Sequence, residues 1–274
     1  MTVFIAGLGL IGGSFAKAFK RHTDHTVYGF DINPATAEFA LSRGAIDKIA
    51  DESDLKDCDL VVVCLYPKAT VDFINRNANT FKKGAVITDA CGVKGVIYKG
   101  IEQTIKDYSL RFVGAHPMAG REHSGFDYSE EELYEGASLI VTPEGADDEA
   151  VRLVCDTAIQ LGFGGCKITD KATHDIMIAY TSQLPHVLAC SYIEDPLATL
   201  HFGYSAGSFK DVSRVAKINA EMWSELFLDN KEALSDEIGA LIKNLTDYKE
   251  LIDKGDRKKL KEALEHSRKI KEQL

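Results

Sequence analysis

The stretch Val3-Phe4-Ile5-Ala6-Gly7-Leu8-Gly9-Leu10-Ile11-Gly12 decides the fold. Its first four residues form an apolar run typical of a buried strand, and its glycines have the spacing G-x-G-x-x-G. The residues that follow, 13–19, have the pattern of a helix. A strand, a glycine-rich turn and a helix in this order predict a doubly wound α/β domain. The N–H groups at the start of the first helix would then point at a bound anion.

Each glycine of this turn has its own physical reason. Gly7 permits the tight turn, Gly9 lets a pyrophosphate approach the backbone, and Gly12 lets helix and strand pack closely. The second predicted strand ends in Asp31, roughly 20 residues beyond the last glycine, where a carboxylate meets the adenosine ribose hydroxyls. Asp31 could instead cap a helix or close a turn. The predicted cofactor-binding residues are Gly7, Gly9, Leu10, Ile11, Gly12 and Asp31.

The same carboxylate indicates which dinucleotide is bound. A negative charge at position 31 would repel the 2′-phosphate of NADP, and the next residues, 32–34, supply no arginine to neutralise that phosphate. The sequence therefore predicts NAD as the cofactor.

The alternation of strands and helices continues to about residue 168. Near-continuous apolar runs separated by helix-like stretches are typical of a parallel sheet that is covered on both faces. After about Thr169 the strand pattern ends, and apolar residues follow the three-or-four spacing of amphipathic helices. We expect an N-terminal Rossmann-like domain over 1–168 and an all-helical domain over 169–274. The predicted strands cover residues 3–6, 26–30, 60–64, 85–88, 111–114, 138–141 and 166–168.

Composition excludes several classes of protein. A chain of 274 residues that is 45% hydrophobic is long enough for one large domain or two smaller ones. The net charge of -10 opposes binding to nucleic-acid phosphates and to anionic lipid, so we expect neither partner. Six cysteines without a C-x-x-C pair, and histidines without a metal-ligand spacing, predict no metal site and a reducing, cytoplasmic setting. The longest apolar run, 60–66, is too short to span a bilayer.

A second motif, His116-Pro117-Met118-Ala119-Gly120, follows the strand predicted to end at Gly114. It therefore emerges at the carboxyl end of the sheet, where ligands bind in such folds, and we expect it to lie in a loop. His116 is the candidate general base, since an imidazole accepts a proton near neutral pH and the following proline stiffens the backbone. Composition alone favours the other interpretation, a structural histidine with satisfied hydrogen bonds.

With these motifs in order, the chain resembles the prephenate dehydrogenases of the bacterial tyrosine pathway. That family is marked by a strand-borne H-P-M-A-G with S-G shortly after it. The resemblance covers most of the chain and also rests on residues 88–94, 182–186 and 209–216, with Met222-Trp223 after them. It implies NAD-dependent oxidative decarboxylation of prephenate to 4-hydroxyphenylpyruvate, CO2 and NADH. It also implies that the helical domain forms a homodimer.

The resemblance implies roles for individual residues. His116 would be the catalytic histidine that holds the ring hydroxyl of the substrate, Arg214 would anchor a carboxylate, and Lys210 and His186 would be supporting polar groups. Lys210 and Arg214 are spaced i, i+4, so on a helix they project from one face. A planar guanidinium suits a carboxylate, and a dianionic substrate needs local cations in a chain of net charge -10. Without the resemblance, the two cations could be an ordinary surface pair.

Three places depart from the family pattern. The family often has G-S-V-K after the strand that ends at Thr88, with the serine hydroxyl beside the substrate hydroxyl, and here the serine position is Gly92. Gln183 stands where many members have a histidine, and residues 217–220 differ from the usual S-D-P. We expect Gly92 to line the substrate site without that polar contact. These departures bear on how the substrate is positioned, and leave the reaction class unchanged.

Glu122 bears on the choice of substrate. It lies six residues past His116, where arogenate users of the wider family keep an acid, and arogenate has an ammonium where prephenate has a ketone. Bacterial prephenate enzymes also carry Glu there, where it can pair with an arginine. We therefore expect prephenate, with two alternatives: an arogenate dehydrogenase, or a non-catalytic NAD-binding regulator. A β-hydroxyacid dehydrogenase is disfavoured, because the second domain lacks the K-x-x-x-N pair of that family.

Overall fold

The computed structural model describes residues 1–121 and 123–274, and the chain divides into two units, Met1–Asn230 and Lys231–Leu274. The first unit contains a sheet of eight strands. These are β1 (Thr2–Ala6), β2 (Thr26–Phe30), β3 (Lys48–Ile49), β4 (Leu60–Val63), β5 (Val86–Asp89), β6 (Arg111–Pro117), β7 (Ser138–Thr142) and β8 (Gly165–Ile168).

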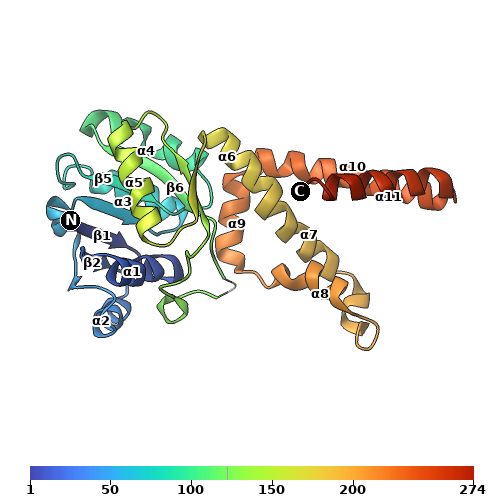
Figure 1. Ribbon diagram of the computed structural model, residues 1–274, viewed down its shortest axis with the longest axis horizontal. Coiled ribbons are helices and arrows are strands. Elements are labelled where there is room, and N and C mark those ends of the chain that lie inside the picture. Colours follow the sequence, from blue (N-terminus) through green and yellow to red (C-terminus); the bar gives the residue numbers. More distant parts are fainter. Residues whose placement is uncertain (122) are drawn as a thin grey trace. The chain divides into compact units, whose positions relative to one another are not determined.

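The strands lie in the order β3-β2-β1-β4-β5-β6-β7-β8 (Figure 1). All neighbouring strands are parallel except β6 and β7, which are antiparallel. The order of the first six strands is that of doubly wound dinucleotide-binding sheets. Such sheets bind ligands beyond the carboxyl ends of their strands, at the point where the strand order reverses. Here that point lies between β1 and β4.

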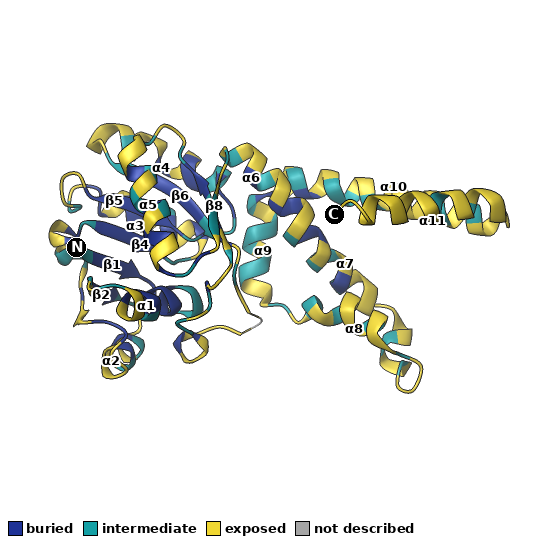
Figure 2. Ribbon diagram, in the orientation of Figure 1, coloured by how far each residue is buried: buried dark blue, intermediate teal, exposed yellow. Residues whose placement is uncertain are grey.

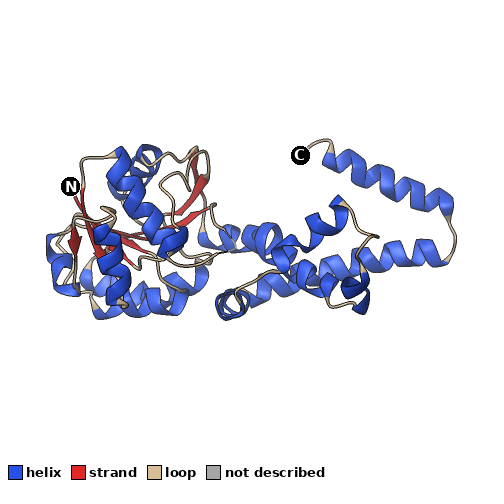
Figure 3. Cartoon of the chain, turned by 90° about the horizontal axis from the view of Figure 1, so that it is seen from below, coloured by secondary structure: helices blue, strands red, loops and turns tan. Residues whose placement is uncertain are grey.

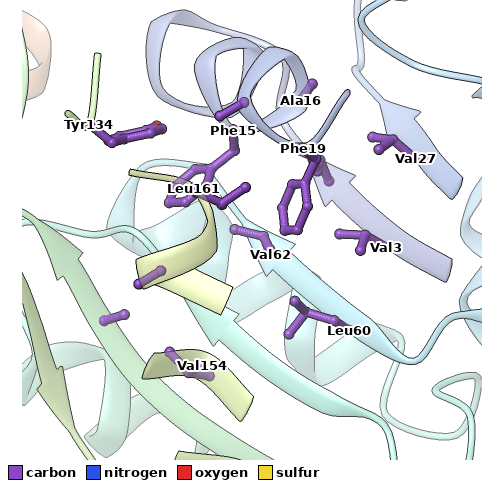
Figure 4. Close-up of a cluster of buried hydrophobic side chains, with 14 of the residues drawn as sticks. Val3, Phe15, Ala16, Phe19, Val27, Leu60, Val62, Tyr134, Val154 and Leu161 are labelled. Atoms are coloured by element: carbon purple, nitrogen blue, oxygen red, sulfur yellow. The ribbon is translucent and has the colours of Figure 1, made fainter. Parts of the chain in front are cut away.

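Helices cover both faces of the sheet, because successive strand residues point to opposite sides. Val3 and Ile5 of β1 belong to one apolar cluster together with Phe15 and Phe19, whereas Phe4 belongs to a second cluster. Figure 4 shows side chains of the first cluster, and Figure 2 shows that the central strands β1, β4 and β5 are buried. The first face is covered by α1 (Leu10–His22), α2 (Pro34–Ser42) and α5 (Asp148–Gln160); the second by α3 (Pro67–Arg76) and α4 (Gly95–Tyr108).

Every regular element that the structure describes after Ile168 is helical (Figure 3). In the first unit these are α6 (Lys171–Ile178), the π-helical turn η3 (Ala179–Gln183), α7 (Leu184–Ile193), the 3-10 turn η4 (Pro196–Leu200), α8 (Gly207–Ser213), the 3-10 turn η5 (Arg214–Ala216) and α9 (Ala220–Asp229). The side chain of Asp170 caps α6 by accepting the N–H of Thr173 at 2.9 Å. Among the described residues, no helix combines the length and the apolar character needed to cross a bilayer.

The second unit consists of α10 (Lys231–Asp253) and α11 (Arg257–Lys271). The two helices contact each other, and the hydroxyl groups of Tyr248 and Ser267 lie 2.8 Å apart. Asp256 caps α11 by accepting the N–H of Lys259. Most residues of α11 are exposed, as the density of lysine and glutamate in this stretch indicates.

The predicted fold class, an N-terminal Rossmann-like domain followed by helices, is confirmed, but three details differ from expectation. The sheet is not wholly parallel, because β7 runs antiparallel to β6. The two-residue strand β3 was not predicted. His116 lies within β6 and not in a loop, because this strand extends to Pro117, opposite Leu139 of β7. The predicted domain boundary at 168/169 lies at the end of β8 and stays a prediction.

Candidate active site

The predicted motifs lie along one edge of the sheet. The glycine-rich turn follows β1, Asp31 follows β2, Gly92 follows β5, and His116 is near the end of β6. These four strands are parallel to one another through the sheet, so their carboxyl ends point the same way. A dinucleotide turn and an imidazole therefore share the edge at which ligands bind in this fold.

The glycine-rich turn has the shape of a phosphate cradle. Gly7 has a φ of +89°, and a Cβ there would lie 2.5 Å from the carbonyl oxygen of Cys64. A Cβ on Gly12 would lie 1.8 Å from the carbonyl oxygen of Gly7, so helix α1 packs against the turn with no room for a side chain. By contrast, a Cβ on Gly9 would meet nothing within 4 Å. The space in front of the second glycine is open, as a pyrophosphate requires.

The start of α1 leaves backbone donors available. Gly9 is its N-cap and contributes no side-chain hydrogen bond, and no acidic residue lies in the first turn. Leu10 and Ile11 begin the helix and are partly exposed. Unsatisfied N–H groups and the positive end of the helix dipole at this place suit a phosphate.

Asp31 is held against the same turn. Its carboxylate accepts the N–H of Leu8 at 2.8 Å and the N–H of Asn33 at 2.9 Å, and the residue is partly exposed. Asp31 is not the N-cap of the next helix. That cap is Asn33, whose side chain accepts the N–H of Ala35 at the start of α2. Asp31 is thus a turn acid next to the glycine turn. Its predicted role toward the ribose stays a prediction.

The ring of His116 is partly exposed and faces Gly92. A Cβ built on Gly92 would lie 3.8 Å from Nε2 of His116 and 3.5 Å from the side chain of Leu226 in α9. Burial lowers the pKa of His116 well below its usual value, and the nearby His174 and Lys94 lower this pKa further. A neutral imidazole at neutral pH can accept a proton, so the geometry and the electrostatics both fit a general base.

Two residues that sequence reasoning missed support this imidazole. Nδ1 of His116 lies 3.0 Å from Nε2 of the buried His174, and Nδ1 of His174 lies 2.7 Å from the carboxylate of Asp175. Asp175 also accepts the backbone N–H groups of Lys94 and Gly95, at 2.8 and 2.7 Å, where α4 begins. The signal in the sequence was the adjacent histidine and aspartate in the helix-like segment after 169.

A buried ion pair lies beneath the same edge. Nζ of Lys94 is 2.5 Å from the carboxylate of Asp89, and both side chains are fully buried. Asp89 also accepts the N–H of Ala115 at 3.1 Å and that of Cys91 at 2.9 Å, so it ties the end of β5 to β6 beside His116. Residues 88–94 entered the prediction only as part of the family resemblance, and neither Lys94 nor Asp89 was predicted to have a role.

Replacement of Lys94 with methionine is expected to lower the free energy of unfolding by about 3–5 kcal/mol, because it leaves the buried carboxylate of Asp89 without its cation. Urea unfolding of both proteins measures this difference. Lys106→Met is the matched control: it removes an exposed lysine from α4, the helix that Lys94 precedes as N-cap, where Lys106 pairs with Glu102, and should change stability little. Equal stability of the two variants would contradict the structural role of the buried pair.

Gln183, one of the departures from the family pattern, is used for helix packing. It lies buried in the π-helical turn η3, where its amide donates to the carbonyl of Leu226 at 3.0 Å. Its carbonyl oxygen accepts from the side chain of the buried Asn230 at 2.8 Å. Because Leu226 contacts the space over Gly92, Gln183 sets the position of α9 against the candidate site. π-Helical turns are frequent at functional sites.

The other predicted substrate residues lie on the helices of the first unit. His186, on α7, donates from Nδ1 to the carbonyl of Ser182 at 2.7 Å, and its ring lies 3.8 Å from that of Trp223, centroid to centroid. Lys210 is exposed on α8, and the exposed Arg214 begins η5, which contacts α7. That Arg214 and His116 bind the same substrate molecule still depends on the resemblance. Glu122 lies outside the described residues.

Comparison with known proteins gives a consistent result. The family model described as "Prephenate dehydrogenase, nucleotide-binding domain" matches residues 15–163, and "Prephenate dehydrogenase, dimerization domain" matches residues 170–266. The cyclohexadienyl dehydrogenase of Zymomonas mobilis is 31% identical, over 99% of this chain and 96% of that protein.

Two solved structures extend the comparison. The prephenate dehydrogenase of A. aeolicus, in complex with hydroxyphenyl propionate and NAD+, has a TM-score of 0.88 and 32% identity. The match covers 100% of this chain and 97% of that one. Synechocystis arogenate dehydrogenase has a TM-score of 0.86 and 26% identity, with 100% and 99% covered.

Proposed function

Because the chain belongs to the prephenate dehydrogenase family, we propose that it catalyses the NAD-dependent oxidative decarboxylation of prephenate to 4-hydroxyphenylpyruvate, CO2 and NADH. One observation carries this proposal: the neutral, partly exposed imidazole of His116 shares a sheet edge with an open glycine turn. The complex of the A. aeolicus relative with NAD+ supports the same cofactor here.

NAD+ fits the residues that this chain offers. The open space at Gly9 and the uncapped start of α1 would hold the pyrophosphate, and the carboxylate of Asp31 would hold the adenosine ribose. Bound there, NAD+ would supply the acceptor for the hydride of the hydroxyl-bearing ring carbon of prephenate.

His116 performs the proton chemistry. Nε2 takes the proton of the ring hydroxyl while that carbon becomes a carbonyl. The ring carboxylate then leaves as CO2, and its electrons complete the aromatic ring while the carbonyl oxygen takes the proton back from Nε2 of His116 and becomes the product hydroxyl. Formation of the aromatic ring makes the overall reaction strongly downhill. The main task of the protein is therefore orientation, which removes roughly 7–11 kcal/mol from the barrier in the best model systems. We propose that Arg214 binds a carboxylate of the substrate and is, with His116, the second catalytic residue. Lys210 and His186 would be supporting polar groups near the substrate.

The division of labour follows the predicted boundary. Residues 1–168 would bind NAD, and residues 169–274 would supply the substrate cations and the dimer contact. The family's dimerization domain supports a homodimer. The excess of negative charge argues against nucleic acid and membrane as partners, and the free cysteines fit a cytoplasmic location.

Arogenate is the alternative substrate, and the similarity to Synechocystis arogenate dehydrogenase supports this alternative. Glu122 is the proposed discriminating residue, because a carboxylate there could pair with the ammonium of arogenate. Comparison of kcat/KM for both compounds in wild type and Glu122→Gln tests this role. An unchanged ratio would exclude Glu122 as the determinant.

Purified protein mixed with NAD+ and prephenate tests the function itself. NADH should form only when prephenate is present, and 4-hydroxyphenylpyruvate should accumulate in equal amount. Parallel reactions with arogenate in place of prephenate, and with NADP+ in place of NAD+, establish which substrate and which cofactor the enzyme prefers. NAD+ binding without turnover of either compound would favour the non-catalytic regulator instead.

Asp31→Ser is expected to relax the choice of cofactor. Removal of the carboxylate removes the repulsion of the 2′-phosphate, so the ratio of kcat/KM for NAD+ to that for NADP+ should fall at least tenfold, about 1.4 kcal/mol or more. Asp107→Ser, which removes an exposed carboxylate from α4, is the control for net charge. If both variants keep the wild-type ratio, Asp31 does not select the cofactor.

The pH profile should reflect the lowered pKa of His116. The imidazole must be neutral to accept a proton, so activity is lost only as the pH falls through its lowered pKa. The acid limb of kcat/KM for prephenate should therefore have its midpoint below 6.5, the ordinary value for histidine. A midpoint at or above 6.5 would show that the surroundings of His116 do not depress its pKa in the free enzyme.

A further inference from the structure

Three titratable side chains form a continuous line that ends at the candidate substrate site. The carboxylate of Asp175 lies 2.7 Å from Nδ1 of His174, and Nε2 of His174 lies 3.0 Å from Nδ1 of His116. The remaining ring nitrogen of His116, Nε2, faces the space over Gly92. Both His174 and Asp175 come from α6, outside the sheet that carries His116.

The directions of these hydrogen bonds follow from the chemistry of the groups. A carboxylate accepts only, and that of Asp175 already accepts two backbone N–H groups at the start of α4. His174 must therefore donate from Nδ1 to Asp175. In a neutral His174 this leaves Nε2 as an acceptor, and the only donor it faces in this contact is the Nδ1–H of His116.

This order fixes the tautomer of His116. The proton of the neutral ring is then on Nδ1, which faces His174 of α6. The lone pair is on Nε2, which faces Gly92. When Nε2 takes a proton, Nδ1–H stays in place and continues to donate to His174, so the imidazolium is accommodated without movement of either ring. An imidazole that lacked an acceptor at Nδ1 would spend part of its time with the proton on Nε2, where it could not act as a base.

We propose that His174 and Asp175 are positioning residues, which hold His116 in the tautomer with an unprotonated Nε2. The proposal builds on the proposed function, since it assigns to these residues the orientation of the base in that reaction. The alternative is that the dyad serves only the packing of α6 against α4, because Asp175 also binds the start of that helix. The tautomer of His116 distinguishes the two, since packing alone makes no demand on it.

Nitrogen-15 NMR of histidine-labelled protein, without substrate, reads the tautomer directly. His116→Gln identifies the signals of His116 among the eight histidines of the chain. The wild-type spectrum should show a protonated Nδ1 and a bare Nε2 on His116. In His174→Phe, which keeps a ring but offers no acceptor, the two tautomers should mix. A wild-type His116 that is protonated on Nε2 overturns the proposal whatever the activity of the enzyme.

Kinetics provide the second measurement. His174→Phe should lower kcat for prephenate roughly 100-fold with little change in KM, whereas His174→Gln should recover most of that loss, because its carbonyl oxygen can accept the Nδ1–H of His116. Asp170→Ala, which removes the cap of the same helix, is the control for loosening of α6 and should keep the wild-type kcat.

The possible failures are distinct. A wild-type enzyme without prephenate-dependent NADH formation contradicts the proposed function, and the tautomer measured by NMR still decides the positioning role. An active wild type with an equally active, folded His174→Phe overturns the positioning role and leaves the function standing. If His174→Phe does not fold, the wild-type tautomer and the kcat of His174→Gln decide instead.

Discussion

His116→Gln is expected to lower kcat for prephenate oxidation roughly 10²–10⁴-fold, the usual contribution of a general base. Glutamine has a similar reach, but its amide cannot accept a proton at neutral pH. The glycine-rich turn and Asp31 are unaffected by the change, so the affinity for NAD+ should stay that of the wild type. Steady-state kinetics with prephenate and calorimetric titration with NAD+ measure the two effects separately.

A control for this variant is His25→Gln. His25 lies beside the N-terminal amine, close to β2 in sequence, and is outside the candidate site. It should keep wild-type kinetics. A His116→Gln enzyme that turns over prephenate as fast as the His25→Gln enzyme would remove His116 from the chemistry.

Gly12→Ala is expected to abolish measurable NAD+ binding and to destabilise the protein. The added Cβ would lie 1.8 Å from the carbonyl oxygen of Gly7, which is backbone and cannot rotate away, so α1 must move from the turn. Overpacking of this kind costs about 1–3 kcal/mol and sometimes more. Urea unfolding measures the stability, and titration with NAD+ measures the binding.

Gly9→Ala is the matched variant, because a Cβ at Gly9 meets nothing within 4 Å in the protein. It should keep wild-type stability and still weaken NAD+ binding, since the new methyl group occupies the space proposed for the pyrophosphate. If Gly9→Ala binds NAD+ normally, the cofactor does not approach the turn at this residue. If Gly12→Ala is as stable as Gly9→Ala, the close packing of α1 is not required.

The parts of the fold that follow local patterns could be predicted from the sequence. The apolar runs around Val3 and Leu60 are buried on both faces of a parallel sheet, so nearly every position is apolar and the strands are easy to recognise. The end of the strand pattern near Thr169 likewise predicted the change to helices. Gly7 and Gly12 of the glycine turn were predictable because each answers a steric demand within the protein, whereas the reason given for Gly9, the approach of a pyrophosphate, stays a prediction.

Features that depend on pairing between distant segments could not be predicted. The antiparallel direction of β7 and the extension of β6 to Pro117 arise from contacts between residues 114–117 and 139–142, which leave no local signature. The buried pair of Lys94 and Asp89 is invisible for the same reason, since burial of two charges depends on the fold around them.

The candidate site shows the same division. His116 could be identified from its motif, but the imidazole of His174, 58 residues away, meets it only because α6 packs beside the sheet edge. The resemblance implied that Gly92 lies near the substrate hydroxyl that His116 would hold, and the structure adds that Gly92 faces Nε2 of His116. Residue types thus predicted the chemistry, while the partners that tune it required the three-dimensional structure.

In the proposed reaction, a neutral His116 accepts the substrate proton beside bound NAD+. The most direct test measures kcat/KM for prephenate across acid and neutral pH in wild type and in His116→Gln. We expect a wild-type profile that falls only at acid pH, and a slow variant whose profile lacks that acid limb. A variant that keeps both the wild-type rate and the wild-type acid limb would contradict it.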